Sequence, residues 1–167
     1  LDHETFTSYL NELIKDDFVT KIGERFYLTK YYEEEKIVAY NLFKISNGKV
    51  KKITKLDEKI SNIENDLNII YNDEQKKAIK EGLSSNVSII SGGPGTGKTT
   101  IIKAIVKIYI KEYMLGTSDI MSNIALLAPT GRASKKLSNS TGLPAYTIHR
   151  FLKWHKDSDS FEYDENN

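Results

Sequence analysis

The chain has 167 residues and a mass of 19.0 kDa, which is enough for one ordinary domain or two small ones. Hydrophobic residues make up 39% and charged residues 28%, a mixture that predicts a folded chain and excludes a disordered one. Cysteine is absent, which excludes disulfides, thiolate zinc sites and cysteine nucleophiles. No apolar run reaches the roughly 18 residues of a membrane helix and no signal peptide opens the chain, so we expect a cytoplasmic protein with no membrane partner. Because the chain begins with Leu1 instead of Met, we expect it to be a piece of a longer protein.

The net charge of +1 is the sum of opposed blocks of charge. Residues 1–35 sum to −5, residues 36–55 to +6 and residues 56–85 to −3. Residues 86–156 sum to +8, and residues 157–167 to −5. The largest block is therefore basic, and it also carries most of the motifs described below.

The first 55 residues predict a helix, a hairpin and a second helix. Apolar residues at helical spacing indicate helices over residues 2–15 and 32–46, and two short strands, residues 18–22 and 25–29, flank a two-residue turn. This order is typical of a small α+β domain, so we assign residues 1–55 to a winged-helix-like or adaptor domain.

A connecting helix and linker are predicted over residues 56–71. Its apolar residues repeat at a spacing of 4-3-4-3 and form one seam: Leu56, Ile60, Ile63, Leu67 and Ile70.

From residue 72 onward the pattern is α/β. Helices are predicted over residues 73–82, 98–114 and 130–139, strands over 87–90 and 124–128, and a loop over 115–123. Both strands lack polar alternation, so we expect both to be buried on two faces in a parallel sheet. We expect the acidic tail, residues 156–167, to be poorly ordered.

Residues 92–99 fit the phosphate-loop pattern G-x-x-x-x-G-K-[ST]. An apolar strand precedes them and a long helix begins at Lys98, which is the context that such a loop requires. The glycines let backbone N–H groups approach phosphate oxygens, Lys98 supplies a positive charge for the β- and γ-phosphates, and Thr99 supplies a hydroxyl for Mg²⁺. The pattern predicts a nucleotide site, and a glycine-rich turn is the alternative.

Gln75 has two competing interpretations. At 17 residues before Gly92, its side-chain amide can pair with both a donor and an acceptor on adenine. It also lies three residues after Asn72, where it completes a capping box at the start of a helix. The spacing alone leaves the two roles open.

Two further segments have the pattern of anion contacts. Residues 128–134 follow the second apolar strand and open a helix that contains Arg132, and residues 147–150 end on Arg150. The chain has 21 lysines and only three arginines, so arginine at these two places suggests bidentate phosphate contact. The alternative is that these two arginines cap helices or form ion pairs on the surface. With no cysteine and three dispersed histidines, the sequence predicts no metal-ligand cluster of its own.

A carboxylate pair for ATP hydrolysis is not evident. After Lys98 the acidic residues are Glu112, Asp119 and those of the tail, and none follows an apolar strand. We therefore expect the chain by itself to have no meaningful ATPase activity.

Taken in order, the segments 72–75, 92–100, 128–133 and 147–150 resemble the leading motifs of the RecD/TraA-like superfamily 1 DNA helicases, the family of the exodeoxyribonuclease V alpha subunit. The resemblance covers about residues 70–155. It implies that residues 72–167 are the first part of a RecA-like P-loop NTPase domain, truncated before its Asp-Glu (Walker B) motif. It implies a parent protein that is an ATP-driven 5′–3′ helicase acting in DNA repair and recombination, with single-stranded DNA and other helicase–nuclease subunits as partners.

The resemblance also assigns residues. The implied ATP and Mg²⁺ ligands, with Thr99 as the metal ligand, are Gln75, Gly92, Gly93, Pro94, Gly95, Thr96, Gly97, Lys98, Thr99 and Thr100. The implied contacts to single-stranded DNA are Thr130, Gly131, Arg132, Thr147, His149 and Arg150.

Two alternatives remain. A small P-loop phosphotransferase would need a lid with several arginines, and the chain has three in total. A non-enzymatic DNA- or protein-docking module would use residues 1–55. The net negative charge of residues 1–35 disfavours contact with phosphates, but the lysines at 49–55 leave DNA docking as an alternative.

Overall fold

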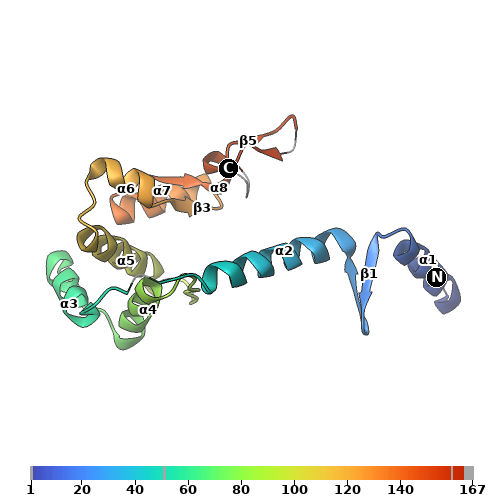
Figure 1. Cartoon of the computed structure of the whole chain (residues 1–167), viewed down its shortest axis with the longest axis horizontal. Helices are drawn as coiled ribbons and strands as arrows, with labels where there is room; N and C mark the ends of the chain where they lie inside the picture. The colour runs from blue at the N-terminus through green and yellow to red at the C-terminus, as the bar shows by residue number, and fades with distance from the viewer. Residues whose placement is uncertain (1, 51, 159, 164–167) are drawn as a thin grey trace. The chain divides into compact units, whose positions relative to one another are not determined.

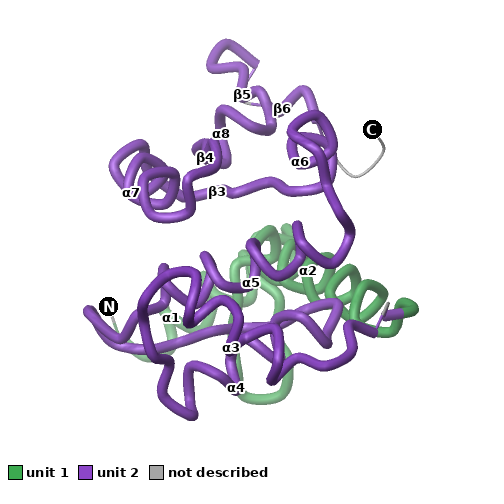
Figure 2. The backbone as a smooth tube through the Cα atoms, turned by 90° about the vertical axis from the view of Figure 1, so that its left-hand side faces the viewer, with its two compact units in different colours: residues 1–49 green, residues 50–167 purple. Residues whose placement is uncertain are grey.

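The computed structural model describes residues 2–50, 52–158 and 160–163 (Figure 1). The chain forms two compact units, residues 1–49 and residues 50–167 (Figure 2). In the described part of the chain, no helix has the length and apolar character that crossing a membrane requires.

The first unit has the predicted order of helix, hairpin and helix. It consists of α1 (His3–Lys15), β1 (Val19–Ile22), β2 (Arg25–Leu28) and α2 (Thr29–Ser46). The carboxylate of Asp2 caps α1 by accepting a hydrogen bond from the Thr5 N–H at 2.7 Å. The strands pair antiparallel with Ile22 opposite Arg25, and Gly23 takes the positive φ of +57° that the tight turn requires. The second helix begins at Thr29, earlier than the predicted residue 32.

This unit buries little of its apolar surface. Among the described residues of 1–49, Val19 alone is buried. Large apolar side chains on both helices and on the hairpin are exposed instead. The winged-helix-like assignment and the domain limits at residues 55 and 71 therefore stay predictions, because the unit shows the element order without a closed core.

Three helices build the core of the second unit. They are α3 (Leu56–Leu67), α4 (Asp73–Ser84) and α5 (Lys98–Glu112), and their fully buried contacts are made by Ile60, Ile63, Ile79 and Ile108. Burying an isoleucine side chain of this kind contributes about 1.5–3 kcal/mol.

The predicted apolar seam of α3 is confirmed at Ile60 and Ile63 and is wrong at Ile70. The helix ends at Leu67 because Asn68 adopts a left-handed conformation, with φ of +51°. The chain then turns away, and Ile70 is 90% exposed.

The predicted strand over residues 87–90 is absent: this segment is described without regular structure, and Ile89 is 90% exposed. A strand needs a partner for its N–H and C=O groups, and β3 (Leu126–Ala128), the expected neighbour, pairs elsewhere. Residues of both segments, among them Ile90 and Ala128, line a cavity of about 620 Å³.

The parallel sheet has two described strands. The predicted second strand exists as β3, with Leu126 and Ala128 buried, and it pairs in parallel with β4 (Ala145–Thr147), which was not predicted. The crossover between them is α7 (Gly131–Thr141), as parallel pairing demands.

Two further predictions need correction. The expected loop over 115–123 contains the helix α6 (Thr117–Asn123), whose start is fixed when the Asp119 carboxylate accepts a hydrogen bond from the Gly116 N–H at 3.1 Å. The tail, residues 156–167, was expected to be poorly ordered, but it contributes β6 (Ser160–Phe161), which pairs antiparallel with β5 (Trp154–His155) after α8 (Ile148–Phe151). Residues 159 and 164–167, which belong to the same prediction, lie outside the described residues.

Candidate functional site

The glycine-rich segment 92–97 lies at the start of α5. Gly95 and Gly97 have φ of +79° and +84°, a left-handed conformation that favours glycine. Gly97 is the N-cap of α5, and this residue makes no side-chain cap hydrogen bond to the first turn. An uncapped helix start of this kind suits an anion, and the anion site stays a prediction. A cavity of about 350 Å³ adjoins the loop and extends along α4.

Lys98 contacts its own loop. Its Nζ donates hydrogen bonds to the carbonyl oxygens of Gly92 and Gly93, each at 2.6 Å. Lys98 also lines both the cavity beside α4 and the larger cavity beside β3. The ammonium group thus lies where phosphate oxygens at the loop would compete with two backbone carbonyls for its protons.

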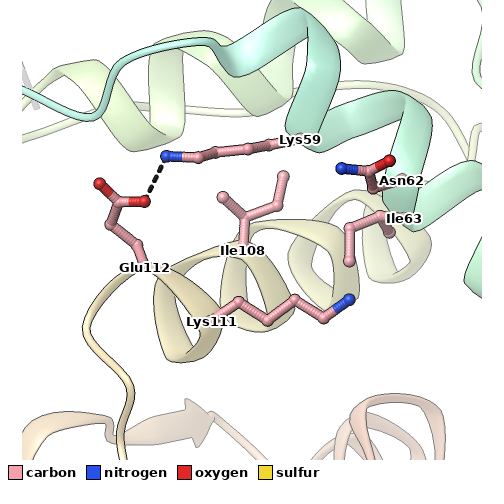
Figure 3. Close-up of a pocket in the computed structure, with 6 residues that line it drawn as sticks. All are labelled: Lys59, Asn62, Ile63, Ile108, Lys111 and Glu112. Carbon is pink, nitrogen blue, oxygen red and sulfur yellow. Dashed lines mark hydrogen bonds and ion pairs between the residues drawn. The ribbon is translucent and has the colours of Figure 1, made fainter.

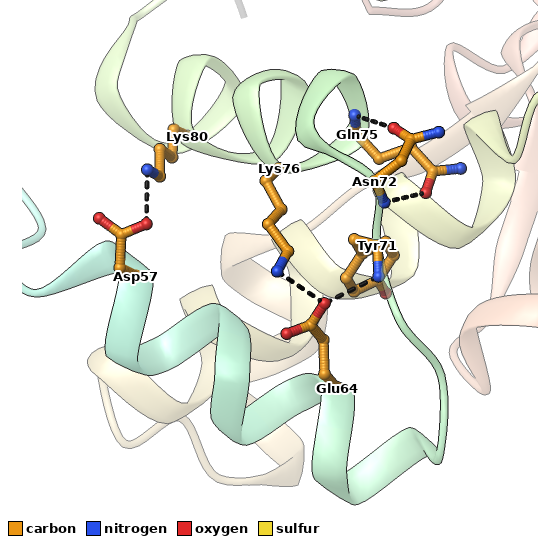
Figure 4. A network of polar contacts seen from close by, with 7 residues as sticks. All are labelled: Asp57, Glu64, Tyr71, Asn72, Gln75, Lys76 and Lys80. Atoms are coloured by element: carbon orange, nitrogen blue, oxygen red, sulfur yellow. Dashed lines mark hydrogen bonds and ion pairs between the residues drawn. The ribbon is translucent and has the colours of Figure 1, made fainter.

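Gln75 caps α4 and also contacts the phosphate loop. Its Oε1 accepts from the Asn72 N–H at 3.1 Å, and Asn72 Oδ1 accepts from the Gln75 N–H at 2.8 Å (Figure 4). Its Nε2 donates to the Thr96 carbonyl oxygen at 3.2 Å. The capping box is therefore present, and the adenine contact stays a prediction, because both ends of the amide already have protein partners.

Gly97 is required by this close approach as well as by its φ. A Cβ atom at residue 97 would lie 2.6 Å from Gln75 Nε2. Any side chain there would displace the amide from the loop.

A partly buried polar network joins the chain between α3 and α4 to both helices and to α5. The Glu64 carboxylate accepts from the Tyr71 N–H at 2.8 Å and from Lys76 Nζ at 3.1 Å (Figure 4). The hydrogen bond from Tyr71 and the charge of Lys76 lower the pKa of Glu64 below its ordinary value of 4.5. The Tyr71 hydroxyl donates to the Thr100 carbonyl oxygen at 3.3 Å, and burial raises the pKa of this hydroxyl.

The buried position of Tyr71 was not predicted from the sequence. This residue is 3% exposed and lies directly before the capping box, in a segment predicted as linker. A large aromatic residue immediately before an N-cap was the available signal, since such residues often pack against the helix that follows.

The two predicted DNA-contacting segments meet at one edge of the parallel sheet. In the β3–β4 register Ala128 lies opposite Thr147, so the carboxyl ends of both strands lead into helices at the same edge. Thr130 Oγ1 accepts from the Ala133 N–H at 3.3 Å and caps α7, and Thr147 Oγ1 accepts from the Arg150 N–H at 3.2 Å and caps α8. Both threonines therefore have structural partners at the positions where DNA contact is predicted.

The charged residues of this edge are accessible. Gly131, Arg132, His149 and Arg150 are exposed, and the Arg150 guanidinium lies over the Tyr146 ring at 5.5 Å. His149 packs against two aromatic rings that sequence analysis did not single out, Trp154 and Phe161. This hairpin was not predicted, because the residues around Phe161 are polar and acidic.

A third cavity, about 220 Å³, lies between α3 and α5 and is lined by charged groups that are paired (Figure 3). Lys59 pairs with Glu112, and Lys111 Nζ lies 2.5 Å from the Asp66 carboxylate. Ile63 and Ile108 lie beneath these pairs. We assign this cavity to the packing of the two helices.

Comparisons with known proteins identify a family and several relatives of this chain. A family model described as an AAA domain matches residues 75–167. The chain is 34% identical over 104 residues to the RecBCD enzyme subunit RecD of Mycolicibacterium smegmatis, covering 53% of this chain and 19% of that protein. It is 33% identical over 155 residues to the RecBCD enzyme subunit RecD of Buchnera aphidicola subsp. Schizaphis graminum, covering 75% of this chain and 25% of that protein. It is 32% identical over 80 residues to the ATP-dependent RecD2 DNA helicase of Deinococcus radiodurans, covering 48% of this chain and 10% of that protein. The chain thus spans a quarter or less of the length of these relatives.

Proposed function

This chain belongs to the AAA domain family, and from that premise we propose that residues 72–167 are the first part of the motor of an ATP-dependent DNA helicase. The longer protein would move 5′ to 3′ on single-stranded DNA. The observation that carries the proposal is the glycine-rich loop at the uncapped start of α5, with Lys98 directed into it. The similarity to proteins named RecD and RecD2 DNA helicase supports the choice of a helicase over a phosphotransferase.

In this proposal the loop holds the phosphates of ATP. Backbone N–H groups of residues 95–99 bind the phosphate oxygens, and Lys98 leaves the Gly92 and Gly93 carbonyls to pair with the β- and γ-phosphates. Gln75, at one wall of the adjoining cavity, is the residue we propose for contact with adenine.

The donor groups at the loop fit Mg²⁺ only together with a nucleotide. Among the described residues, no cluster of three or more His, Cys, Asp or Glu side chains could hold a metal ion. Thr99 offers one hydroxyl, and Mg²⁺ is ordinarily held by protein oxygens together with substrate phosphates and water. Bound there, Mg²⁺ would neutralise the charge that develops on the phosphates during hydrolysis.

The edge formed by α7 and α8 is the proposed single-strand path. Arg132 and Arg150 are exposed near the ends of two paired strands, where guanidinium groups can form bidentate contacts with backbone phosphates. The charge of +8 over residues 86–156 supports an anionic partner for this part of the chain.

Residues 1–55 are the proposed winged-helix-like or adaptor domain, and residues 56–71 its connection to the motor. Exposed apolar side chains on the first unit favour a role in docking, and two of the relatives are named as subunits of the RecBCD enzyme. We therefore propose other helicase–nuclease subunits as its partners and the cytoplasm as its location.

The proposal is tested by nucleotide binding to the 167-residue chain and by unwinding with the longer protein. Lys98→Ala should abolish binding of an ATP analogue in the presence of Mg²⁺ and abolish unwinding of a duplex with a 5′ single-stranded tail. Lys77→Ala, which removes an exposed lysine of α4, should change neither. Equal unwinding of 5′-tailed and 3′-tailed duplexes would contradict the polarity, and undiminished ATP binding by Lys98→Ala would contradict the site.

A further inference from the structure

Three aromatic side chains form a cluster where α8 meets the terminal hairpin. Trp154 and Phe161 are opposite one another in the β5–β6 pair, and their rings lie 4.7 Å apart between centroids and are tilted by 57°. The His149 ring lies 5.9 Å from Trp154 and 5.8 Å from Phe161. Helix α8 and strand β5 are neighbours in the chain and in space (Figure 1).

The cluster is only partly buried. Trp154 is 36% exposed and Phe161 is 38% exposed, and His149 is also exposed. A ring pair that served only as a hairpin core gains most by being covered, since each ring has a large apolar surface to remove from water. Here the rings support one another and still leave part of their surface open.

Basic residues lie close to these rings in the sequence. From His149 to Lys156 the sequence contains three permanently charged bases, Arg150, Lys153 and Lys156, and no acid. Lys153 Nζ lies 4.6 Å from the centroid of the Tyr163 ring and pairs with Glu162 at 2.6 Å. Glu162 and Asp157 are the acids described near these bases, and the Glu162 carboxylate also lies 3.7 Å from His155 Nε2.

We propose that His149, Trp154 and Phe161 form a base-stacking site for single-stranded DNA, and this inference rests on the function proposed above. Partly exposed aromatic rings in a segment rich in basic residues match the chemistry of an unpaired strand, in which bases stack and phosphates pair with Lys and Arg. The site continues the α7–α8 edge, because His149 belongs both to the predicted DNA contacts and to the cluster. Stacking does not depend on base identity, so the site would bind any sequence that is unpaired.

Trp154 makes the site directly measurable, because it is the only tryptophan of the chain. The 167-residue chain is titrated with oligodeoxythymidylate, with an abasic oligomer of the same length and with a blunt duplex, while tryptophan emission is recorded. Oligodeoxythymidylate should quench Trp154, and the other two should leave its emission nearly unchanged. This readout needs no variant, so it holds even if a substitution disturbs the hairpin.

Variants separate stacking from charge. Trp154→Leu keeps an apolar side chain but removes the π face, and it should weaken oligodeoxythymidylate binding roughly tenfold while leaving abasic binding unchanged. Trp154→Phe should restore most of the affinity. Phe18→Leu, the matched loss of a ring that is 64% exposed in the first unit, should have no effect.

The outcomes distinguish this site from the proposed function. Equal affinity for the oligodeoxythymidylate and abasic oligomers, with unquenched Trp154, would overturn the stacking site and leave DNA binding intact. Binding of neither oligomer would overturn the DNA path as well. Quenching by the duplex as strong as by the single strand would overturn the requirement for unpaired bases.

Discussion

Gln75 and Thr96, 21 residues apart in the sequence, are joined by a hydrogen bond of 3.2 Å from Gln75 Nε2 to the Thr96 carbonyl oxygen. The same glutamine completes the capping box of α4 through its Oε1. One side chain thus connects the start of α4 with the glycine-rich loop, so a displacement of the Gln75 amide would reach the loop directly.

Substitution of Gln75 should affect both the helix and the nucleotide site. Gln75→Ala removes the cap contact, the bond to Thr96 and the proposed contact with adenine, and the loss of one hydrogen bond to adenine, about 1 kcal/mol, would weaken ATP binding about fivefold. Asn72→Ala is the matched control, since it removes the N-cap acceptor, costs about 1 kcal/mol of stability and leaves the Gln75–Thr96 bond in place. Calorimetric titration of the wild type and of each variant measures the affinity for ATP and, for comparison, the affinity for GTP. If Asn72→Ala weakens ATP binding as much as Gln75→Ala does, Gln75 acts only through the cap.

The two arginines of the α7–α8 edge should contribute to DNA affinity through phosphate contact. Arg132→Ala and Arg150→Ala should each weaken binding of single-stranded DNA and reduce the slope of log affinity against log salt by about 0.7. Arg25→Ala serves as the control, because Arg25 is the remaining arginine of the chain and lies in the first unit. Fluorescence anisotropy at several salt concentrations provides the slopes, and an unaltered slope would return both arginines to a structural role.

Glu64 should make stability depend on pH in the acid range. Its folded-state pKa is lowered chiefly by the hydrogen bond from the Tyr71 N–H and also by Lys76, so the ionised form is favoured in the folded chain. The stabilisation is therefore fully present above the ordinary pKa of 4.5. It is lost as the pH falls below 4.5 and passes through the lower pKa that Glu64 has in the folded chain.

The comparison that isolates Glu64 is between the wild type and Glu64→Gln in urea unfolding at several pH values. The variant should be less stable at pH 7, and the difference should shrink as the pH falls below 4.5. Glu81→Gln, at an exposed position on α4, should follow the wild type. A difference that stays constant with pH would mean that the carboxylate charge of Glu64 does not stabilise the fold.

Local patterns in the sequence predict the parts of this structure that local chemistry determines. The capping box at Asn72, the start of α5 at Lys98 and the buried seam at Ile60 and Ile63 are all present. Each depends on residues within one or two helical turns, where side-chain spacing and backbone conformation are coupled.

Two of the incorrect predictions concern pairing between strands. Residues 87–90 have the composition of a buried strand, but a strand exists only where another strand meets its backbone groups. Conversely, Trp154 and Phe161 pair in a hairpin although the residues between them are polar and acidic. The cluster with His149 could not be predicted because it depends on that pairing.

Gly82 of α4 lies close to the Ile105 side chain of α5, and its substitution should reveal this contact. A Cβ atom at residue 82 would lie 2.6 Å from Ile105 Cδ1, closer than real Cβ contacts. Alanine favours a helix over glycine by about 1 kcal/mol, but overpacking costs about 1–3 kcal/mol, so Gly82→Ala should be neutral or destabilising. Ile105→Val removes the clashing atom, and in that background Gly82→Ala should become stabilising. Urea unfolding of the two single variants and the double variant measures the coupling. Additive effects would show that the Ile105 side chain already moves aside without cost.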